Sequence, residues 1–357
     1  MENLWQFYLL ILFILISGVF SFDKNNKNIF ILLCFLELTF IAGFRAWHIG
    51  NDTMPYIGTF IETINNWNFL HTHMEKGYIF YNKLVSFFTL NPQGILVVNA
   101  FVITGSILLF IKRYSVSVLF SVLFFVILQF DSTMNIMRQY ISVSIILFSM
   151  PFIIKRRLIP YIIFCVIATT FHYSAILAIP LYWLYTLEFK IQYLLMIIFI
   201  TLISVTMLAP IIDKIIYFTG RYESYVGNIL LGEEIKIASI VKAFVQLAIT
   251  VFCYFSYKYV YPSNKLKSPV RVQFLLWTSI IAVCMQIISI RGTVMERLVV
   301  YYSIFNLISV AFFVSCYSKK SRLLVASAVL SCCIIYHSVI FVYRPDWNHI
   351  LPFEFCF

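Results

Sequence analysis

Hydrophobic runs of 13 to 23 residues follow one another along this chain, separated by short polar segments. A helix of about 20 apolar residues crosses the hydrocarbon core of a bilayer. The pattern therefore predicts an all-α, polytopic helix bundle, a single transmembrane domain over 1–357. Its twelve spans are expected at 4–22, 29–44, 94–111, 115–130, 134–154, 158–170, 171–186, 190–212, 238–260, 272–290, 297–317 and 322–343.

The segment 158–186 is either one long helix or two short helices that meet near His172. Loop charge decides, because the Lys and Arg of short loops stay on the cytoplasmic face of a membrane protein. With the segment split in two, the cytoplasmic loops hold fifteen of the 26 Lys and Arg, but only Asp23 and Glu188 of the 15 acids. We therefore predict two helices here, with both chain termini on the outer face.

Composition agrees with a membrane protein. Of the 357 residues, 62% are hydrophobic and 11% are charged, whereas a soluble domain carries about 25% charged residues. The net charge of +11 is explained by the sorting of basic loops, so no nucleic-acid partner is expected. The eight cysteines lie mostly within apolar runs, and no Cys/His spacing suits zinc. Walker A, G-x-S-x-G and H-E-x-x-H motifs are absent, so we expect neither a metal nor a cofactor.

Two outer-face segments are long enough to carry polar chemistry, 45–93 and 213–237. The latter part of the first has a helical spacing of apolar side chains, which predicts a helix lying in the membrane interface. The residues of that spacing are Tyr78, Tyr81, Leu84, Val85 and Phe88.

Arg138 lies about one turn into a predicted span, next to Gln139. A charge inside a span is costly and is a functional candidate by default. At a helix end, however, an arginine can also reach the interface with its side chain alone. Since this helix begins at the outer face, its N-terminus and Arg138 present positive potential at one place, which suits a phosphate.

Further arginines lie in outer loops, from which positive-inside sorting should deplete them. Arg291 and Arg297 bracket a short turn in which Glu296 is placed to orient one guanidinium. Arg221 is close to Tyr225 in the segment 213–237. Arginine with tyrosine suits a phosphosugar, through bidentate bonds to phosphate and an aromatic face for the ring. An ordinary solvated loop is the alternative for both segments.

Three residues are candidates for proton transfer. Asp52 and Glu75 are the outer carboxylates nearest to apolar segments, and either could accept a proton from a hydroxyl. Asp52 could equally cap a helix. His172 lies at a predicted break between helices, where irregular backbone must face protein or a cavity. A structural, hydrogen-bonded histidine is the alternative.

A series of short motifs resembles a known family. In order they are FRAWHIGNDTMPY, EKGYIFYNKL, MRQYISVSI, FHYSAI, GRYESY, MERLVVYYS and a terminal WNHILPF. Together they are similar to the EpsG-like branch of the Wzy-type polysaccharide polymerases. At the matching positions the resemblance points to Arg45, Asp52, Arg138, Gln139, His172, Arg221, Arg291, Glu296 and Arg297.

The resemblance implies a helix bundle of the GT-C type that joins undecaprenyl-pyrophosphate-linked oligosaccharides at the outer, periplasmic face of the bacterial inner membrane. Expected partners are this lipid-linked substrate and membrane lipid, and a chain-length regulator protein is a further candidate. The polar cluster at 45–56, which contains Arg45 and Tyr56, is then expected to form one wall of a phosphosugar site.

Three other functions remain open. An O-antigen ligase uses the same donor and is poorly separated from a polymerase by sequence. A flippase for lipid-linked sugars would place charges through the middle of the membrane, where this chain has few. A membrane acyltransferase that decorates the glycan is the third.

Overall fold

Helices make up the regular structure of the described part of the chain. The computed structural model describes residues 4–21, 23, 26–66, 74–219, 237–264, 266–291, 296–344 and 348–357, without the side chains of 208–219, 264 and 291. Within these residues the regular elements are helical, and an isolated β-bridge joins Arg45 to Phe355. The chain forms two compact units: unit 1 is Met1–Ile179 with Ser318–Phe357, and unit 2 is Pro180–Tyr317.

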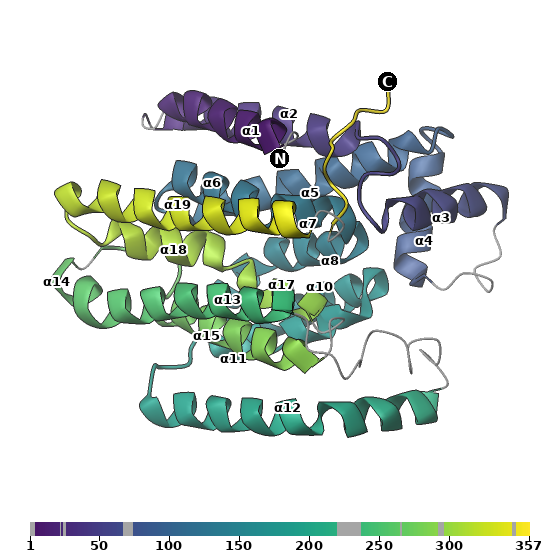
Figure 1. Ribbon diagram of the computed structural model, residues 1–357. Helices are drawn as coiled ribbons and strands as arrows, with labels where there is room; N and C mark the ends of the chain where they lie inside the picture. The colour runs from purple at the N-terminus through teal and green to yellow at the C-terminus, as the bar shows by residue number, and fades with distance from the viewer. Residues whose placement is uncertain are drawn as a thin grey trace. The chain divides into compact units, whose positions relative to one another are not determined.

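Unit 1 has two interior helices, α5 (Gln93–Tyr114) and α8 (Met137–Phe148), which pack on each other. Helix α2 lies along α5, and α19 lies along α6 (Figure 1). The other elements of unit 1 are α1 (Leu4–Ser17), η1 (Gly18–Ser21), α2 (Lys27–Gly43), α3 (Thr53–Asn65), α4 (Lys76–Ser86), α6 (Val118–Leu128), α7 (Phe130–Asn135), α9 (Met150–Ile154), α10 (Leu158–Phe171), η3 (Tyr173–Ala178) and α19 (Lys319–Tyr343).

Unit 2 has α15 (Val272–Ile288) between α12 (Ile191–Thr219) and α13 (Ile237–Phe255), and it packs against both. Helix α13 continues through a π-helical turn, η5 (Ser256–Val260), into α14 (Tyr261–Asn264). The remaining elements are α11 (Leu181–Leu184), η6 (Ser289–Arg291), η7 (Arg297–Val299), α17 (Val300–Ser303) and α18 (Asn306–Ser315).

The helices are those of a multi-pass membrane protein, as predicted. Each of the twelve predicted ranges contains helix. Among the described residues, six helical segments are long and apolar enough to cross a membrane: Leu4–Ser21, Gln93–Tyr114, Met137–Ile154, Ile237–Ser263, Arg297–Ser315 and Lys319–Tyr343. The range 190–212 holds the long helix α12, and the remaining predicted ranges hold shorter helices.

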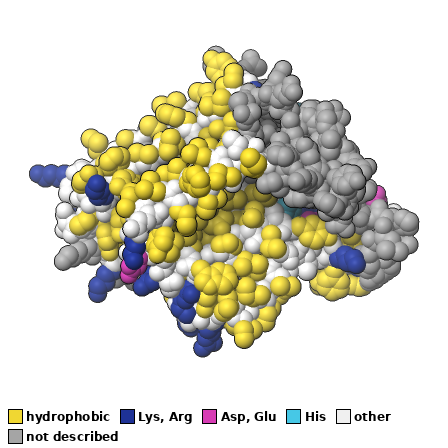
Figure 2. All heavy atoms as spheres, turned by 90° about the horizontal axis from the view of Figure 1, so that it is seen from below, with side chains coloured by type: hydrophobic (Ala, Val, Ile, Leu, Met, Phe, Trp, Pro, Cys, Tyr) yellow, Lys and Arg dark blue, Asp and Glu magenta, His cyan; other side chains and the backbone are white. Residues whose placement is uncertain are grey.

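Large apolar side chains are exposed on many helices, for example Leu12 and Ile16 of α1 and Leu323 and Leu324 of α19. Figure 2 shows one face of the surface on which hydrophobic side chains dominate and charged ones are few. Exposed apolar surface on this scale marks contact with a membrane rather than with water.

The predicted break in the segment 158–186 is present. Helix α10 ends at Phe171, and His172 is extended, with φ −155° and ψ 120°. The hydroxyl of Tyr161 donates to the carbonyl oxygen of Ala178, so the chain after His172 runs back alongside α10. Within unit 1, α10 and η3 therefore form a hairpin, and the turn places His172 at the end of α10.

Segment 45–93 folds into two helices, α3 and α4, which pack on each other. The Nζ of Lys83 in α4 donates to the carbonyl oxygen of Thr63 in α3, at 3.1 Å. The predicted apolar face of α4 is divided between protein and the exposed surface. Leu84 and Phe88 are exposed, as a lipid-facing position requires, whereas Tyr78 and Val85 are buried, because α3, α5 and α10 cover that side of the helix.

The predicted topology can be tested by cysteine labelling. In a variant whose eight cysteines are replaced, we expect a single cysteine at position 156 to resist a membrane-impermeant maleimide in intact cells. A cysteine at position 91 should react. Permeabilised cells are the control, in which both should react. Labelling of position 156 from the outside would contradict the assignment of the basic loops to the cytoplasm.

Candidate active site

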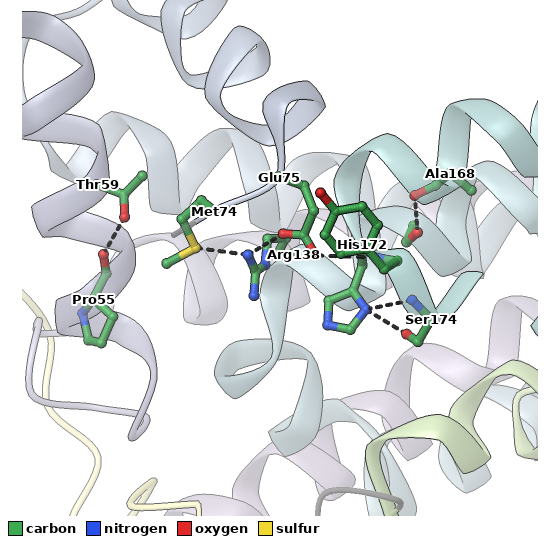
Figure 3. Close-up of polar contacts among 10 residues, drawn as sticks. Pro55, Thr59, Met74, Glu75, Arg138, Ala168, His172 and Ser174 are labelled. Atoms are coloured by element: carbon green, nitrogen blue, oxygen red, sulfur yellow. Dashed lines mark hydrogen bonds and ion pairs between the residues drawn. The ribbon is translucent and has the colours of Figure 1, made fainter. Parts of the chain in front are cut away.

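An ion pair between Arg138 and Glu75 is the centre of the candidate site (Figure 3). Arg138 is the second residue of α8, and its side chain is 18% exposed, against 7% for that of Glu75. The Nη1 of Arg138 contacts a carboxylate oxygen of Glu75 and lies 2.9 Å from the sulfur of Met74. The guanidinium Nε is buried and has no hydrogen-bond partner, so this arginine retains a donor for a ligand.

Glu75 joins three elements. It occupies the position before the first residue of α4, in an extended conformation, but its side chain does not cap that helix. One carboxylate oxygen faces Arg138 of α8, and the other accepts from the backbone N–H of Tyr173, at 3.3 Å, in the turn after α10. Arg138 and Tyr173 lie 63 and 98 residues after Glu75 in the sequence, and the fold brings all three together.

Gly77 allows the close approach that this geometry needs. A Cβ at this position would lie 2.7 Å from the carbonyl oxygen of Thr170 in α10, a distance that real Cβ contacts do not show. Any larger residue would push the start of α4 away from the end of α10. Glu75, two residues earlier, would then lose the backbone donor of Tyr173.

Two opposing effects act on the Glu75 carboxyl. Burial raises its pKa above the ordinary value, because desolvation disfavours the charged form. The positive charge of Arg138 and the backbone N–H donors oppose this effect. The basicity of Glu75 therefore depends on how closely the guanidinium of Arg138 contacts it.

His172 shapes the turn beside this pair. Its Nδ1 lies 2.5 Å from the Oγ of Ser174 and accepts from the backbone N–H of Ser174, at 3.4 Å. An Nδ1 that accepts a hydrogen bond leaves the proton of the neutral ring on Nε2. Figure 3 shows the ring next to the Glu75–Arg138 pair. His172 thus orients the turn whose next residue, Tyr173, binds Glu75.

Tyrosines line the protein side of α4. The rings of Tyr56 and Tyr78 are 5.7 Å apart, those of Tyr78 and Tyr81 are 6.1 Å apart, and Tyr81 lies 5.9 Å from Phe171. Tyr56 was expected to bind substrate, but it is 5% exposed. Its place in this aromatic row favours a packing role.

Arg45 lies in the interior, 1% exposed. Its guanidinium donates to the carbonyl oxygens of Ala42, Ile49 and Met134, the last at 2.8 Å. Met134 lies four residues before Arg138, so Arg45 ties the loop after α2 to the chain that leads into α8. This placement favours a structural role for Arg45 over the expected contact with substrate.

Asp52 and Gln139 flank the same region. Asp52 precedes α3 as its capping residue, but its side chain makes no capping bond, and its backbone N–H donates to the Oδ1 of Asn135 at 2.9 Å. Gln139 is 1% exposed, with a buried Oε1. Asp52 contacts Asn135, which lies just before the start of α8, and Gln139 is the third residue of α8. The assignment of Asp52 as a catalytic residue and of Gln139 as a binding residue stays a prediction.

In unit 2, the carboxylate of Glu296 pairs with the Nζ of Lys242 in α13. The expected contact with the guanidinium of Arg291 or Arg297 stays a prediction, since the side chain of Arg291 lies outside the described residues. Arg297 is exposed at the start of η7, and Arg291 ends η6. Lys242 was missed because it lies inside an apolar run, although an intramembrane lysine is itself an uncommon signal. Arg221 and Tyr225 lie outside the described residues.

These features define an all-α, multi-pass membrane protein with a buried arginine–glutamate pair among its helices. The model of the EpsG family matches residues 28–355, and the chain therefore belongs to that family. Membership supports a role like that of a polysaccharide polymerase. Comparisons with curated proteins and with solved structures gave no match.

The interaction between Arg138 and Glu75 predicts a measurable change in protonation. Dicyclohexylcarbodiimide reacts with protonated carboxyls, and its labelling of Glu75 should fall as pH rises through the pKa of this carboxyl. In Arg138→Gln we expect that fall at higher pH, because burial still raises the pKa while the opposing positive charge is gone. Peptide mass spectrometry gives the labelled fraction.

Glu354, whose side chain is 60% exposed, is the internal control and should label equally in both proteins. Glu75→Gln should remove the label at position 75. An unchanged pH profile in Arg138→Gln would contradict the interaction.

Proposed function

We propose that this protein polymerises a surface polysaccharide, O-antigen or a related glycan, at the periplasmic face of the bacterial inner membrane. Donor and acceptor are oligosaccharide repeat units linked to undecaprenyl pyrophosphate. Family membership supports the reaction class, and the apolar helices support a substrate that stays in the bilayer. A chain-length regulator protein is a proposed further partner.

The Glu75–Arg138 pair is the observation that carries the proposal. Glycosyl transfer from a pyrophosphate needs a base for the acceptor hydroxyl and positive charge for the leaving group. A carboxylate and a guanidinium in contact provide both in one place. The guanidinium also belongs to the first turn of α8, where the helix dipole favours an anion.

Donor binding is the first step of the proposed mechanism. A pyrophosphate oxygen competes with Glu75 for the Arg138 guanidinium, and the unpartnered Nε allows a second, parallel bond to phosphate. As Arg138 turns to the phosphate, Glu75 loses the positive charge that held its pKa down. The carboxylate then becomes a stronger base, because it remains buried.

Transfer of the glycan follows. Glu75 accepts the proton of the acceptor hydroxyl, and that oxygen forms a bond to the anomeric carbon of the donor sugar. The bond between this carbon and the pyrophosphate oxygen breaks, and undecaprenyl pyrophosphate leaves with its added negative charge facing Arg138. Donor binding thereby activates the base, so that Glu75 is a strong base only when a donor is present.

A genetic test reads the polysaccharide on a gel. We expect deletion to leave single repeat units attached to core lipid, without long chains. The wild-type gene should restore the ladder, whereas Glu75→Gln should lower polymerisation about 10²–10⁴-fold, the usual contribution of general base catalysis. Arg138→Lys should also lose most activity, because lysine cannot form the planar bidentate contact.

Arg113→Lys, in the last turn of α5, is the matched control and should behave as wild type. Variants are compared at equal membrane abundance and detergent melting temperature. No attached repeat units at all would indicate a ligase, and units retained at the inner face would indicate a flippase. Full-length chains after deletion, without a second polymerase in the strain, would refute the proposal.

A further inference from the structure

Lys242 is a second cation set among apolar helices, and the mechanism above does not use it. It lies in the second turn of α13, within a segment of mean hydropathy 1.8. Its ammonium pairs with the carboxylate of Glu296, and the two side chains are 22% and 14% exposed. An ionised side chain inside a span is a functional candidate, with its partner named.

Buried polar groups without partners surround this lysine on one face of α13. Ser239 and Gln246 lie three residues before and four residues after Lys242, so the three side chains share a face of the helix. Ser239 is 0% exposed and Gln246 is 8% exposed. The Oγ of Ser239 and the Nε2 of Gln246 have no hydrogen-bond partner.

Thr250, a neighbouring polar residue on α13, does have a hydrogen-bond partner. One turn after Gln246, the hydroxyl of Thr250 donates to the carbonyl oxygen of Ser279 at 3.0 Å. A buried donor without a partner costs about 1–3 kcal/mol. The packing of α13 on α15 therefore explains why a polar residue stands at position 250. It does not explain the buried Oγ of Ser239 and Nε2 of Gln246, which have no hydrogen-bond partner.

We propose that Lys242, Ser239 and Gln246 form a second binding site for a pyrophosphate group. The site would hold the second lipid-linked substrate that a polymerase requires, and in this sense it rests on the proposed function. One ammonium and two neutral donors suit the oxygens of a phosphate. Asn306 donates to the Oε1 of Gln246 at 3.0 Å, and its own Oδ1 is buried without a partner. That acceptor suits a hydroxyl of the attached sugar.

Glu296 has the same relation to Lys242 as Glu75 has to Arg138. In each unit, a carboxylate balances the cation when no ligand is bound. An incoming pyrophosphate replaces the carboxylate as the partner of the cation. The charge of the site then stays compensated in both states, which a cation among apolar helices requires.

The experiment counts ligands on the full-length protein in lipid nanodiscs. The probe is undecaprenyl pyrophosphate, and native mass spectrometry gives the stoichiometry. We expect two equivalents on the wild type, one on Lys242→Gln and one on Arg138→Gln. Gln246→Leu should weaken one equivalent about tenfold, the worth of one hydrogen bond to a charged group.

Two variants control for damage to the fold. Lys242→Arg keeps the charge and should keep two equivalents, and Thr250→Val alters the same helix face one turn away and should also keep two. Undecaprenol should not bind at either site. Competition by inorganic pyrophosphate alone would show that the headgroup suffices, and its failure would show that the lipid is also required.

The outcomes separate this inference from the proposed function. Two equivalents on Lys242→Gln, with one on Arg138→Gln, would overturn the second site and leave the function intact. No binding of undecaprenyl pyrophosphate to the wild type would contradict the proposed function itself.

Discussion

The contact between Glu75 and Arg138 determines how the candidate site of unit 1 is arranged. Both side chains are largely shielded from water, that of Arg138 being 18% and that of Glu75 7% exposed, so each charge depends on the other for compensation. The start of α4, the first turn of α8 and the turn after α10 are therefore held at one point. The same interaction is the basis of the proposed site for an anionic substrate.

The surrounding structure supports that contact. Arg45 holds the loop after α2 against the chain leading into α8, and Gly77 lets α4 approach α10. The C-terminal tail adds a second connection, since the backbone N–H of Ala46 donates to the carbonyl oxygen of Glu354, and that of Cys356 to the carbonyl oxygen of Phe44, both at 2.9 Å. These hydrogen bonds pair backbone N–H and C=O groups, for which the lipid of a membrane offers no hydrogen-bond partner.

The sequence predicted the helices because apolar runs of spanning length report directly on burial in lipid. It predicted the break at His172 through loop charge, and it named Glu75 and Arg138 separately. Their pairing was not predictable, because 63 residues separate them and no local pattern records the contact. The buried position of Arg45 was not predictable, since an arginine after an apolar run is typical of a solvent-facing loop. The partner of Glu296 was missed because Lys242 lies within a run that otherwise reads as lipid-facing.

In the proposed mechanism, the donor pyrophosphate and Glu75 compete for Arg138. The most direct measurement is the affinity of undecaprenyl pyrophosphate for Glu75→Gln, compared with wild type, at the equivalent that Arg138→Gln removes. We expect tighter binding by Glu75→Gln together with lost polymerisation, because Glu75 no longer occupies the guanidinium of Arg138 before the ligand arrives. Binding that is unchanged or weaker in Glu75→Gln would contradict it.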